Sequence, residues 1–221
     1  ARYAWELGEF LTGKGDEVVI VSLYTDEKLY NSKKIKIINL ADTTFLPQSI
    51  KFWTNLSNIQ QRLANIVKKE EPDLVLFNHF PCTLWAQKFQ NIPVLCYPQD
   101  IELLYSDTYT NNLPTFTRIL WKFFRLFVRY YDRKKWENFD LVIANSNFSG
   151  KKLEEKYNLK PNMVYPGANT KVFLPTEKNL DEKSILLIAD GKVPRVEFAL
   201  KNIKEILKKR QDFKIWIAGN H

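Results

Sequence analysis

Short apolar runs alternate with longer amphipathic segments along the chain, and this alternation limits the possible folds more than any other feature of the sequence. Strands that alternate with helices at this spacing predict an α/β fold with parallel sheets and right-handed crossovers. The continuous apolar run at 17–23 is typical of a strand buried on both faces. The predicted strands are 17–23, 34–40, 73–79, 92–98, 140–146, 162–167, 184–190 and 213–219. The predicted helices are 1–14, 49–70, 83–90, 114–138, 147–158 and 196–210.

The pattern divides the chain into two predicted domains of unequal size. Residues 1–168 form one α/β domain, residues 169–183 hold no clear element and are interpreted as a linker, and residues 184–221 begin a fresh strand–helix–strand unit. A doubly wound domain normally begins with a strand and its phosphate-facing loop, whereas this sequence begins on a helix and stops directly after a strand. We therefore expect a fragment in which both ends are cut.

Composition disfavours several kinds of partner and site. The net charge of +8 favours anionic partners, but no RNA- or DNA-reading motif accompanies it, so we expect no nucleic-acid partner. No apolar run reaches the ~20 residues needed to cross a bilayer. Two histidines and two cysteines are too few for the usual Cys/His clusters, so no metal site is predicted. Cys82 and Cys96 are interpreted as reduced thiols of a cytosolic protein.

Polar residues follow several of the predicted strands. In open α/β sheets, ligands bind beyond the carboxyl ends of the strands, so these residues are candidates for a site. Loops are polar in general, and the alternative is therefore a solvated sheet edge. The clusters are Asn78-His79, Gln99-Asp100, Asn145-Ser146, Asp190-Gly191-Lys192 and Gly219-Asn220.

Each candidate side chain has a functional and a structural interpretation. His79 can act as an acid, a base or a hydroxyl-orienting donor near neutral pH, or it is a structural histidine at a strand end. Ser146 is expected first as the N-cap of the helix at 147–158, with a sugar or phosphate contact as the alternative. Lys192 and Arg195 lie just before a predicted helix N-terminus, where cations and free amides can neutralise a diphosphate leaving group without a metal. The alternative for both is a solvated basic loop.

The helix predicted at 114–138 combines positive charge with aromatic side chains. Its basic residues recur at every third or fourth position, which places them on one face of a helix with ~3.6 residues per turn. Such a helix can lie on an anionic membrane surface. The alternative is a core-packing helix with a solvated basic edge. The basic stripe consists of Arg118, Lys122, Arg125, Arg129 and Arg133.

The segment LVIANSNFSGKKLEEKYNLKPNMVYPGANTKVF at 141–173 resembles the hallmark of glycosyltransferase family 4. In that family an apolar strand runs into Ala-Asn-Ser, a helix ends near Tyr-Gly, and a Pro-Gly turn precedes Thr and Phe. The segment DLVLFNHF at 73–80 resembles a further strand end of the family, and 184–219 resembles the start of its donor domain. The residues that match the hallmark are Ala144-Asn145-Ser146, Tyr157, Val164, Pro166-Gly167, Thr170 and Phe173.

The resemblance implies a GT-B fold of two Rossmann-like domains, with residues 1–168 on the acceptor side and the nucleotide-sugar donor domain starting at 184. It implies transfer of a hexose from a nucleotide sugar to a glycan or lipid-linked acceptor, with retention of anomeric configuration. It implies no essential metal or other cofactor, and a cytoplasmic protein that is peripheral on the membrane. The residues expected to serve are His79 and Asp100 for catalysis, Asn78, Gln99 and Ser146 for the acceptor, and Lys192, Arg195 and Gly219 for the donor.

Other functions stay open on the sequence. One is a GT-B sugar-nucleotide epimerase, and another is a non-catalytic, membrane-associated interaction module that kept the fold and lost the site. The family's Glu-x7-Glu segment, which holds the donor sugar, would lie beyond residue 221. We therefore expect the 221-residue chain alone to be inactive.

Overall fold

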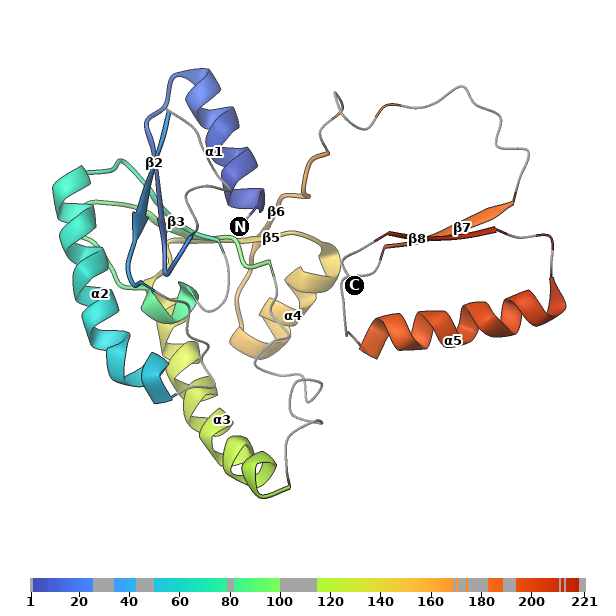
Figure 1. Ribbon diagram of the computed structural model, residues 1–221. Coiled ribbons are helices and arrows are strands. Elements are labelled where there is room, and N and C mark those ends of the chain that lie inside the picture. The colour runs from blue at the N-terminus through green and yellow to red at the C-terminus, as the bar shows by residue number, and fades with distance from the viewer. Residues whose placement is uncertain are drawn as a thin grey trace. The chain divides into compact units, whose positions relative to one another are not determined.

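The computed structural model divides into two compact units, Ala1–Pro166 and Gly167–His221, and each is described by itself (Figure 1). Helices and strands alternate along the described residues, as the sequence predicts. The residues that the structure describes are 2–25, 34–42, 50–78, 82–99, 115–168, 170, 174, 183–188, 194–210, 212 and 214–218.

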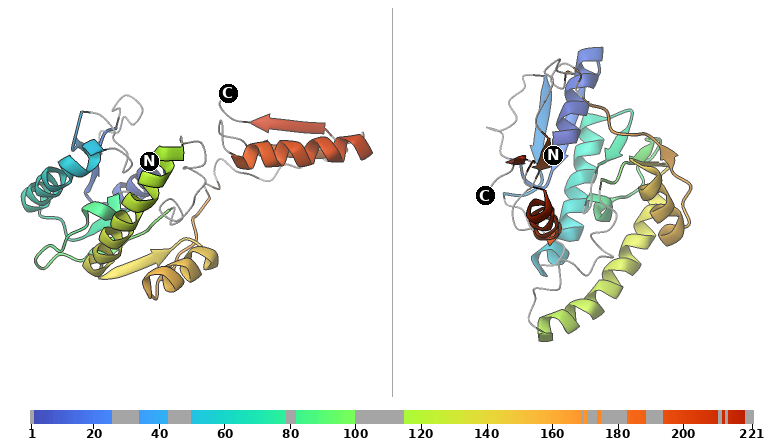
Figure 2. Two further views of the ribbon diagram at one scale, coloured as in Figure 1. Left: turned by 90° about the horizontal axis from the view of Figure 1, so that it is seen from below. Right: turned by 90° about the vertical axis from the view of Figure 1, so that its right-hand side faces the viewer.

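The first unit contains two parallel sheets, which confirms the predicted α/β class. Strand β1 (Val18–Ser22) pairs with β2 (Ile35–Asn39). The second sheet has the order β3 (Val75–Phe77), β4 (Val94–Cys96), β5 (Leu141–Ala144) and β6 (Asn162–Met163). Helix α4 (Asn147–Tyr157) packs beside β5 and β6 (Figure 2). The other helical elements of the unit are α1 (Arg2–Lys14), α2 (Ile50–Glu70), η2 (Cys82–Trp85), α3 (Thr115–Lys135) and η3 (Trp136–Asn138).

Local sequence explains several helix ends. Gly15 has φ +103° directly after α1, an angle that residues with a Cβ atom rarely adopt. Asn158 ends α4 in the left-handed region, and its N–H donates to the carbonyl oxygen of Glu154. At the start of α4, the side chain of Ser146 accepts a hydrogen bond from the N–H of Ser149. The predicted N-cap role of Ser146 is therefore confirmed.

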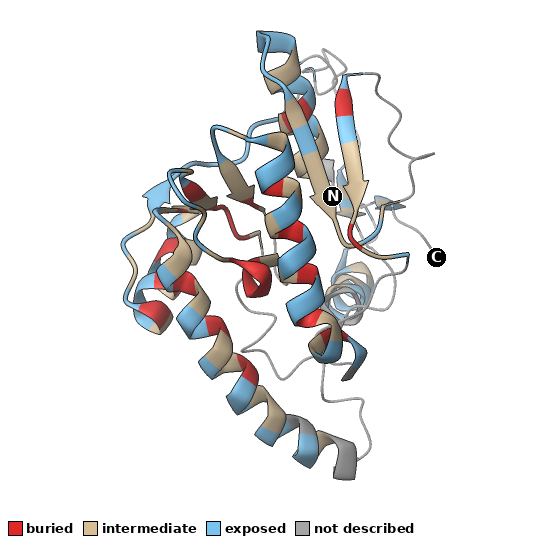
Figure 3. Ribbon diagram, turned by 90° about the vertical axis from the view of Figure 1, so that its left-hand side faces the viewer, coloured by how far each residue is buried: buried red, intermediate tan, exposed pale blue. Residues whose placement is uncertain are grey.

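The core of the first unit is organised around α2. Its apolar residues recur at every third or fourth position, and Figure 3 shows buried residues recurring along this helix. Removal of this stripe from water stabilises the packing of α2 on the β3–β6 sheet. The buried residues of α2 are Phe52, Leu56, Ile59, Leu63 and Val67. They share one core cluster with Phe77, Val94, Cys96, Val142 and Ala144 of the sheet.

Several elements differ from the sequence predictions. The strands predicted at 92–98 and 162–167 are the three-residue β4 and the two-residue β6. The run at 17–23 is not buried on both faces, because no residue of β1 is buried and Val19 is 36% exposed. Among the described strands, β1 pairs only with β2. The helix predicted at 83–90 is the single 3-10 turn η2, and the strand predicted at 73–79 is the three-residue β3.

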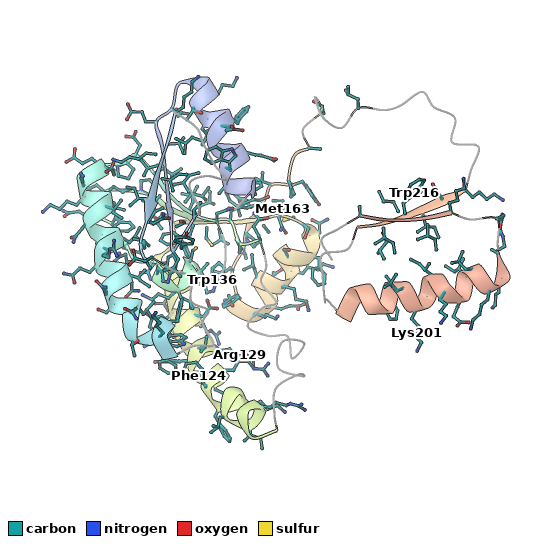
Figure 4. The ribbon with its side chains drawn as sticks, in the orientation of Figure 1. Phe124, Arg129, Trp136, Met163, Lys201 and Trp216 are labelled. Atoms are coloured by element: carbon teal, nitrogen blue, oxygen red, sulfur yellow. The ribbon has the colours of Figure 1, made fainter. Side chains whose placement is uncertain are left out.

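The second unit consists of β7 (Ser184–Ile188), α5 (Pro194–Lys209) and β8 (Lys214–Ala218). The two strands pair in parallel, with Leu186 opposite Trp216. Figure 4 shows Trp216 on the face of the strands that is turned away from α5. The predicted strand–helix–strand order is present, whereas the donor role expected for this unit stays a prediction.

Candidate functional site

Side-chain hydrogen bonds join three strand ends of the β3–β6 sheet. Asn78 directly follows β3, Gln99 lies shortly beyond β4, and Asn145 directly follows β5. The Nε2 atom of Gln99 donates to Oδ1 of Asn78 at 3.4 Å, and Nδ2 of Asn145 donates to the carbonyl oxygen of Gln99 at 3.4 Å. Parallel pairing thus brings three of the predicted polar clusters together at one edge of the sheet.

The joined amides have hydrogen-bonding capacity beyond these two contacts. All three side chains are half-buried, and both bonds are long for an N–H donor. A side-chain amide carries two N–H donors and an oxygen that can accept two hydrogen bonds. This chemistry suits a ligand rich in hydroxyl groups, which both donate and accept.

Ser146 extends the site to the start of α4. Its Oγ lies 3.2 Å from the N–H nitrogen of Ser149, 3.0 Å from Oγ of Ser149 and 3.3 Å from Oδ1 of Asn145. The hydroxyl is therefore committed to capping α4 and to holding Asn145 in place. Its predicted contact with an acceptor stays a prediction.

Tyr97 lies directly after β4, at the same end of the sheet as Gln99, and the sequence did not identify it as a site residue. Because Tyr97 belongs to the apolar run 92–98, the sequence pattern marks it only as a residue of a strand. Its ring is 5.0 Å from the ring of Tyr3 in α1, and its hydroxyl donates to the carbonyl oxygen of Val164 at 3.0 Å. Burial, with Tyr3 beside it, raises the pKa of Tyr97 to about 12, so the phenol stays neutral and joins α1, β4 and the residues after β6.

A cleft of about 260 Å³ lies between the end of β2 and α2. A guanidinium nitrogen of Arg62 donates to the carbonyl oxygen of Leu40 and holds the end of β2 to the helix. Polar side chains over an apolar floor are typical of small-molecule sites. The only sign of this cleft in the sequence is that the polar residues that line it recur at helical spacing within 49–70. The cleft is lined by Asp42, Lys51, Asn55, Asn58 and Arg62 around Ile59.

Several predicted site residues lie outside the described residues. His79 and Asp100 follow Asn78 and Gln99 directly in the sequence, but neither is described. On the donor side, Lys192 and Gly219 are likewise outside the described residues. Arg195 belongs to the first turn of α5, and only its backbone is described.

The described residues contain neither a metal-binding cluster nor a membrane-spanning helix. In that part of the chain, no group of three His, Cys, Asp or Glu residues is arranged to hold a metal ion. No helix within the described ranges is both long and apolar enough to cross a bilayer. The predicted independence from metal stays a prediction.

Solved structures with the same fold include two enzymes of known type. A glycosyltransferase from Rickettsia africae is 18% identical, with a TM-score of 0.59, and the match covers 98% of this chain and 64% of that one. A sucrose-phosphate synthase from Thermosynechococcus elongatus is 16% identical, with a TM-score of 0.60, and the match covers 96% of this chain and 63% of that one. The chain therefore spans less than two thirds of the length of either structure.

These two likenesses support the predicted GT-B type of fold. A comparison with curated protein sequences gave no match. The family model for Glycosyltransferase Family 4 matches residues 1–172, which include α1 to β6 and the hallmark segment up to Val172. Since this match covers most of the chain, the protein belongs to glycosyltransferase family 4.

Proposed function

We propose that the full-length protein is a retaining glycosyltransferase that moves a hexose from a nucleotide sugar to a glycan or lipid-linked acceptor. The observation that carries the proposal is the joined strand ends Asn78, Gln99 and Asn145 in a chain that belongs to glycosyltransferase family 4. Their amide groups supply donors and acceptors for the hydroxyl groups of a sugar at the ligand-binding edge of a parallel sheet.

The proposed roles follow from position along the chain. His79 and Asp100 adjoin Asn78 and Gln99, so they are the proposed residues that orient an acceptor hydroxyl or move its proton. Lys192, Arg195 and Gly219 are the proposed contacts to the donor diphosphate. Cations and backbone N–H groups stabilise a leaving diphosphate electrostatically, so the proposed reaction needs no bound metal.

The proposed acceptor places the protein at a membrane. A lipid-linked acceptor is held in a bilayer, and a nucleotide sugar is dissolved in the cytoplasm. We therefore place the protein in the cytoplasm, peripheral on the membrane face, with α3 as the element nearest the lipid.

Turnover by the full-length protein tests this function. The measurement is release of nucleoside diphosphate from a panel of nucleotide hexoses, with and without acceptor, in the presence of a chelator. We expect release that depends on acceptor and persists without free metal. Asn78→Ala and Gln99→Ala should each lower kcat/KM about tenfold, which corresponds to ~1.4 kcal/mol. Asn65→Ala is the matched control, because Asn65 is an exposed amide on α2 outside the joined strand ends.

Each other result identifies a rival function. Interconversion of the nucleotide sugar without an acceptor would indicate a sugar-nucleotide epimerase. Binding of the nucleotide sugar without turnover, in any acceptor mixture, would indicate a non-catalytic module. If the anomeric proton of the product shows inversion by NMR, the retaining mechanism is wrong even though glycosyl transfer is correct.

A further inference from the structure

One side of α3 is fixed against the rest of the first unit. Val128 and Asp132 are fully buried, and together they define the inward direction of the helix. Trp53 of α2 makes edge contacts with Phe124, Phe127 and Tyr131, at ring distances of 5.5, 5.4 and 5.7 Å. Figure 4 shows Phe124 in the region where α2 and α3 meet. These contacts determine which side of α3 remains for solvent or a partner.

The opposite side of α3 is apolar and exposed. At about 100° per residue, Ile119, Phe123, Leu126 and Tyr130 project away from the side that holds Val128 and Asp132. We call these four residues, with Leu120 and Phe127 beside them, the apolar ridge. Every one of the six is at least half exposed, and Phe123 is 69% exposed. From Ile119 to Tyr130 the ridge is about 16 Å long at ~1.5 Å per residue.

Positive charge borders the ridge. Lys122 and Arg133 are exposed along one side of it, and the ammonium group of Lys134 lies 4.7 Å from the ring centre of Tyr130. The only acidic residue between 115 and 135 is Asp132, and it is buried on the inward side. The exposed part of α3 therefore presents apolar and cationic groups and no carboxylate.

The basic stripe differs from this border. Arg118, Arg125 and Arg129 of the stripe are only half exposed, because they lie between the inward side and the ridge. The outermost surface of the helix is therefore apolar rather than basic. This arrangement changes which residues can meet a membrane first.

We propose that the apolar ridge inserts into the interface of an anionic bilayer, with Lys122, Arg133 and Lys134 at the level of the headgroups. A helix with an apolar face, cationic borders and a Tyr at the boundary is suited to lie in the plane of a membrane interface. A second copy of the chain is a poorer occupant, because two facing ridges would bring like charges together. This proposal builds on the proposed function, because it names the residues of α3 that contact the membrane. Binding to the membrane does not itself depend on glycosyl transfer.

Vesicle co-sedimentation of the 221-residue chain tests the insertion. The probes are vesicles of phosphatidylcholine mixed with phosphatidylserine, and vesicles of phosphatidylcholine alone. Phe123→Glu/Leu126→Glu should lower the partition coefficient on mixed vesicles at least tenfold, because two charges would enter the apolar layer. Phe10→Glu is the matched control, since Phe10 on α1 is 62% exposed and lies outside the ridge, and it should bind like the unmodified chain.

A second variant separates insertion from charge attraction. Lys122→Glu/Arg133→Glu should also weaken binding to mixed vesicles. We expect a loss of about fivefold for each positive charge removed, because a Lys or Arg near an acidic surface contributes ~1 kcal/mol. That defect should shrink as salt rises, because exposed charges are screened within ~8 Å at physiological ionic strength. The defect of Phe123→Glu/Leu126→Glu should persist at high salt.

Several outcomes would overturn the inference. One is equal binding of Phe123→Glu/Leu126→Glu and the unmodified chain, with both shown to be folded by circular dichroism. Another is a salt-sensitive defect in the charge variant with no defect in the ridge variant, because the basic residues alone would then carry the binding. If the chain is a dimer that the ridge variant converts to a monomer, and neither binds vesicles, the occupant is a second copy. Turnover of the full-length protein on a water-soluble acceptor tests the proposed function separately.

Discussion

Helices α2 and α3 have the same length of 21 residues and lie in the same unit, yet they use their apolar residues in opposite ways. Helix α2 buries a regular stripe from Phe52 to Val67. Among the described side chains of α3, those of Val128 and Asp132 alone are fully buried, while the apolar ridge faces outward. Helix α2 is therefore part of the core, whereas α3 is attached to the core by a small number of residues.

The anchoring of α3 relies on a few specific contacts. The hydroxyl group of Tyr157 in α4 donates a short hydrogen bond to Oδ2 of Asp132, and Nε1 of Trp136 donates to the same oxygen at 3.2 Å. Trp136 also packs on Tyr157, with ring centres 4.7 Å apart. The two hydrogen bonds to Asp132, which we call the polar knot, and the packing of Trp136 on Tyr157 thus hold α3 to the rest of the unit. The opposite face of the helix therefore has no structural role in the unit. The exposed face of α2, in contrast, is polar and includes Asn65.

The largest expected effect concerns the core side of the comparison. Phe52→Ala should lower the free energy of unfolding by about 3–5 kcal/mol, because Phe52 is completely buried and its removal leaves a cavity. Urea unfolding followed by tryptophan fluorescence measures the loss. Phe52→Leu is the control and should cost less than about 1.5 kcal/mol. A loss below about 1 kcal/mol for the alanine variant would contradict the role assigned to α2.

A smaller loss is expected when the polar knot is removed. Asp132→Ala should lower the free energy of unfolding by about 2–3 kcal/mol, because the buried donors of Tyr157 and Trp136 lose their acceptor. Asp132→Asn retains an acceptor oxygen and should cost less. Thermal unfolding of the two variants side by side provides the measurement, and equal losses would show that hydrogen bonding at this position does not anchor α3.

The same carboxyl group predicts a dependence of stability on pH. Burial raises the pKa of Asp132 to about 6 from an ordinary value near 3.8, although the hydrogen bonds from Tyr157 and Trp136 lower it. The folded state therefore binds the proton more tightly, so this group's contribution is complete below about pH 4 and is lost as pH rises through about 6. The slope is at most ~1.4 kcal/mol per pH unit.

A difference measurement isolates this effect. The unfolding free energy of Asp132→Asn minus that of the unmodified chain should rise between about pH 4 and pH 6 and become level above about pH 7. Cys96 interacts electrostatically with Asp132, but burial raises the pKa of its thiol well above the usual range, so it stays neutral in this interval. A difference that is constant with pH would mean that Asp132 does not titrate in this window.

The smallest expected effect concerns the exposed side of the comparison. Phe123→Ala on the apolar ridge should change the free energy of unfolding by no more than about 0.5 kcal/mol, since the ring makes little contact with the core. The same measurement as for Phe52→Ala gives a matched pair of Phe truncations on two helices of equal length. A loss above about 2 kcal/mol would show that the ridge is part of the core and not a free surface.

Much of the candidate site was predictable from position along the chain, and its contacts were not. Asn78, Gln99 and Asn145 were candidates because ligands bind beyond the carboxyl ends of the strands in open α/β sheets. The hydrogen bonds between them depend on the register of β3, β4 and β5, which are far apart in the sequence. The sequence pattern did not reveal the contacts of Tyr97 or the cleft beside α2. Both depend on residues that are distant in the sequence and come together only when the chain has folded.

By itself the sequence determined the order of helices and strands, the cap at Ser146 and the family, because these depend on residue types at fixed local spacings. Only the tertiary structure decided which side of α3 faces inward. The sequence places the basic stripe on one face of that helix, but apolar residues cover most of the remaining surface, so the pattern does not say which of them face inward. The choice was made by Trp53 of α2 and Tyr157 of α4, which contact α3 from distant parts of the chain. Trp53 also touches Phe127 at the margin of the apolar ridge, and the other ridge residues remain exposed.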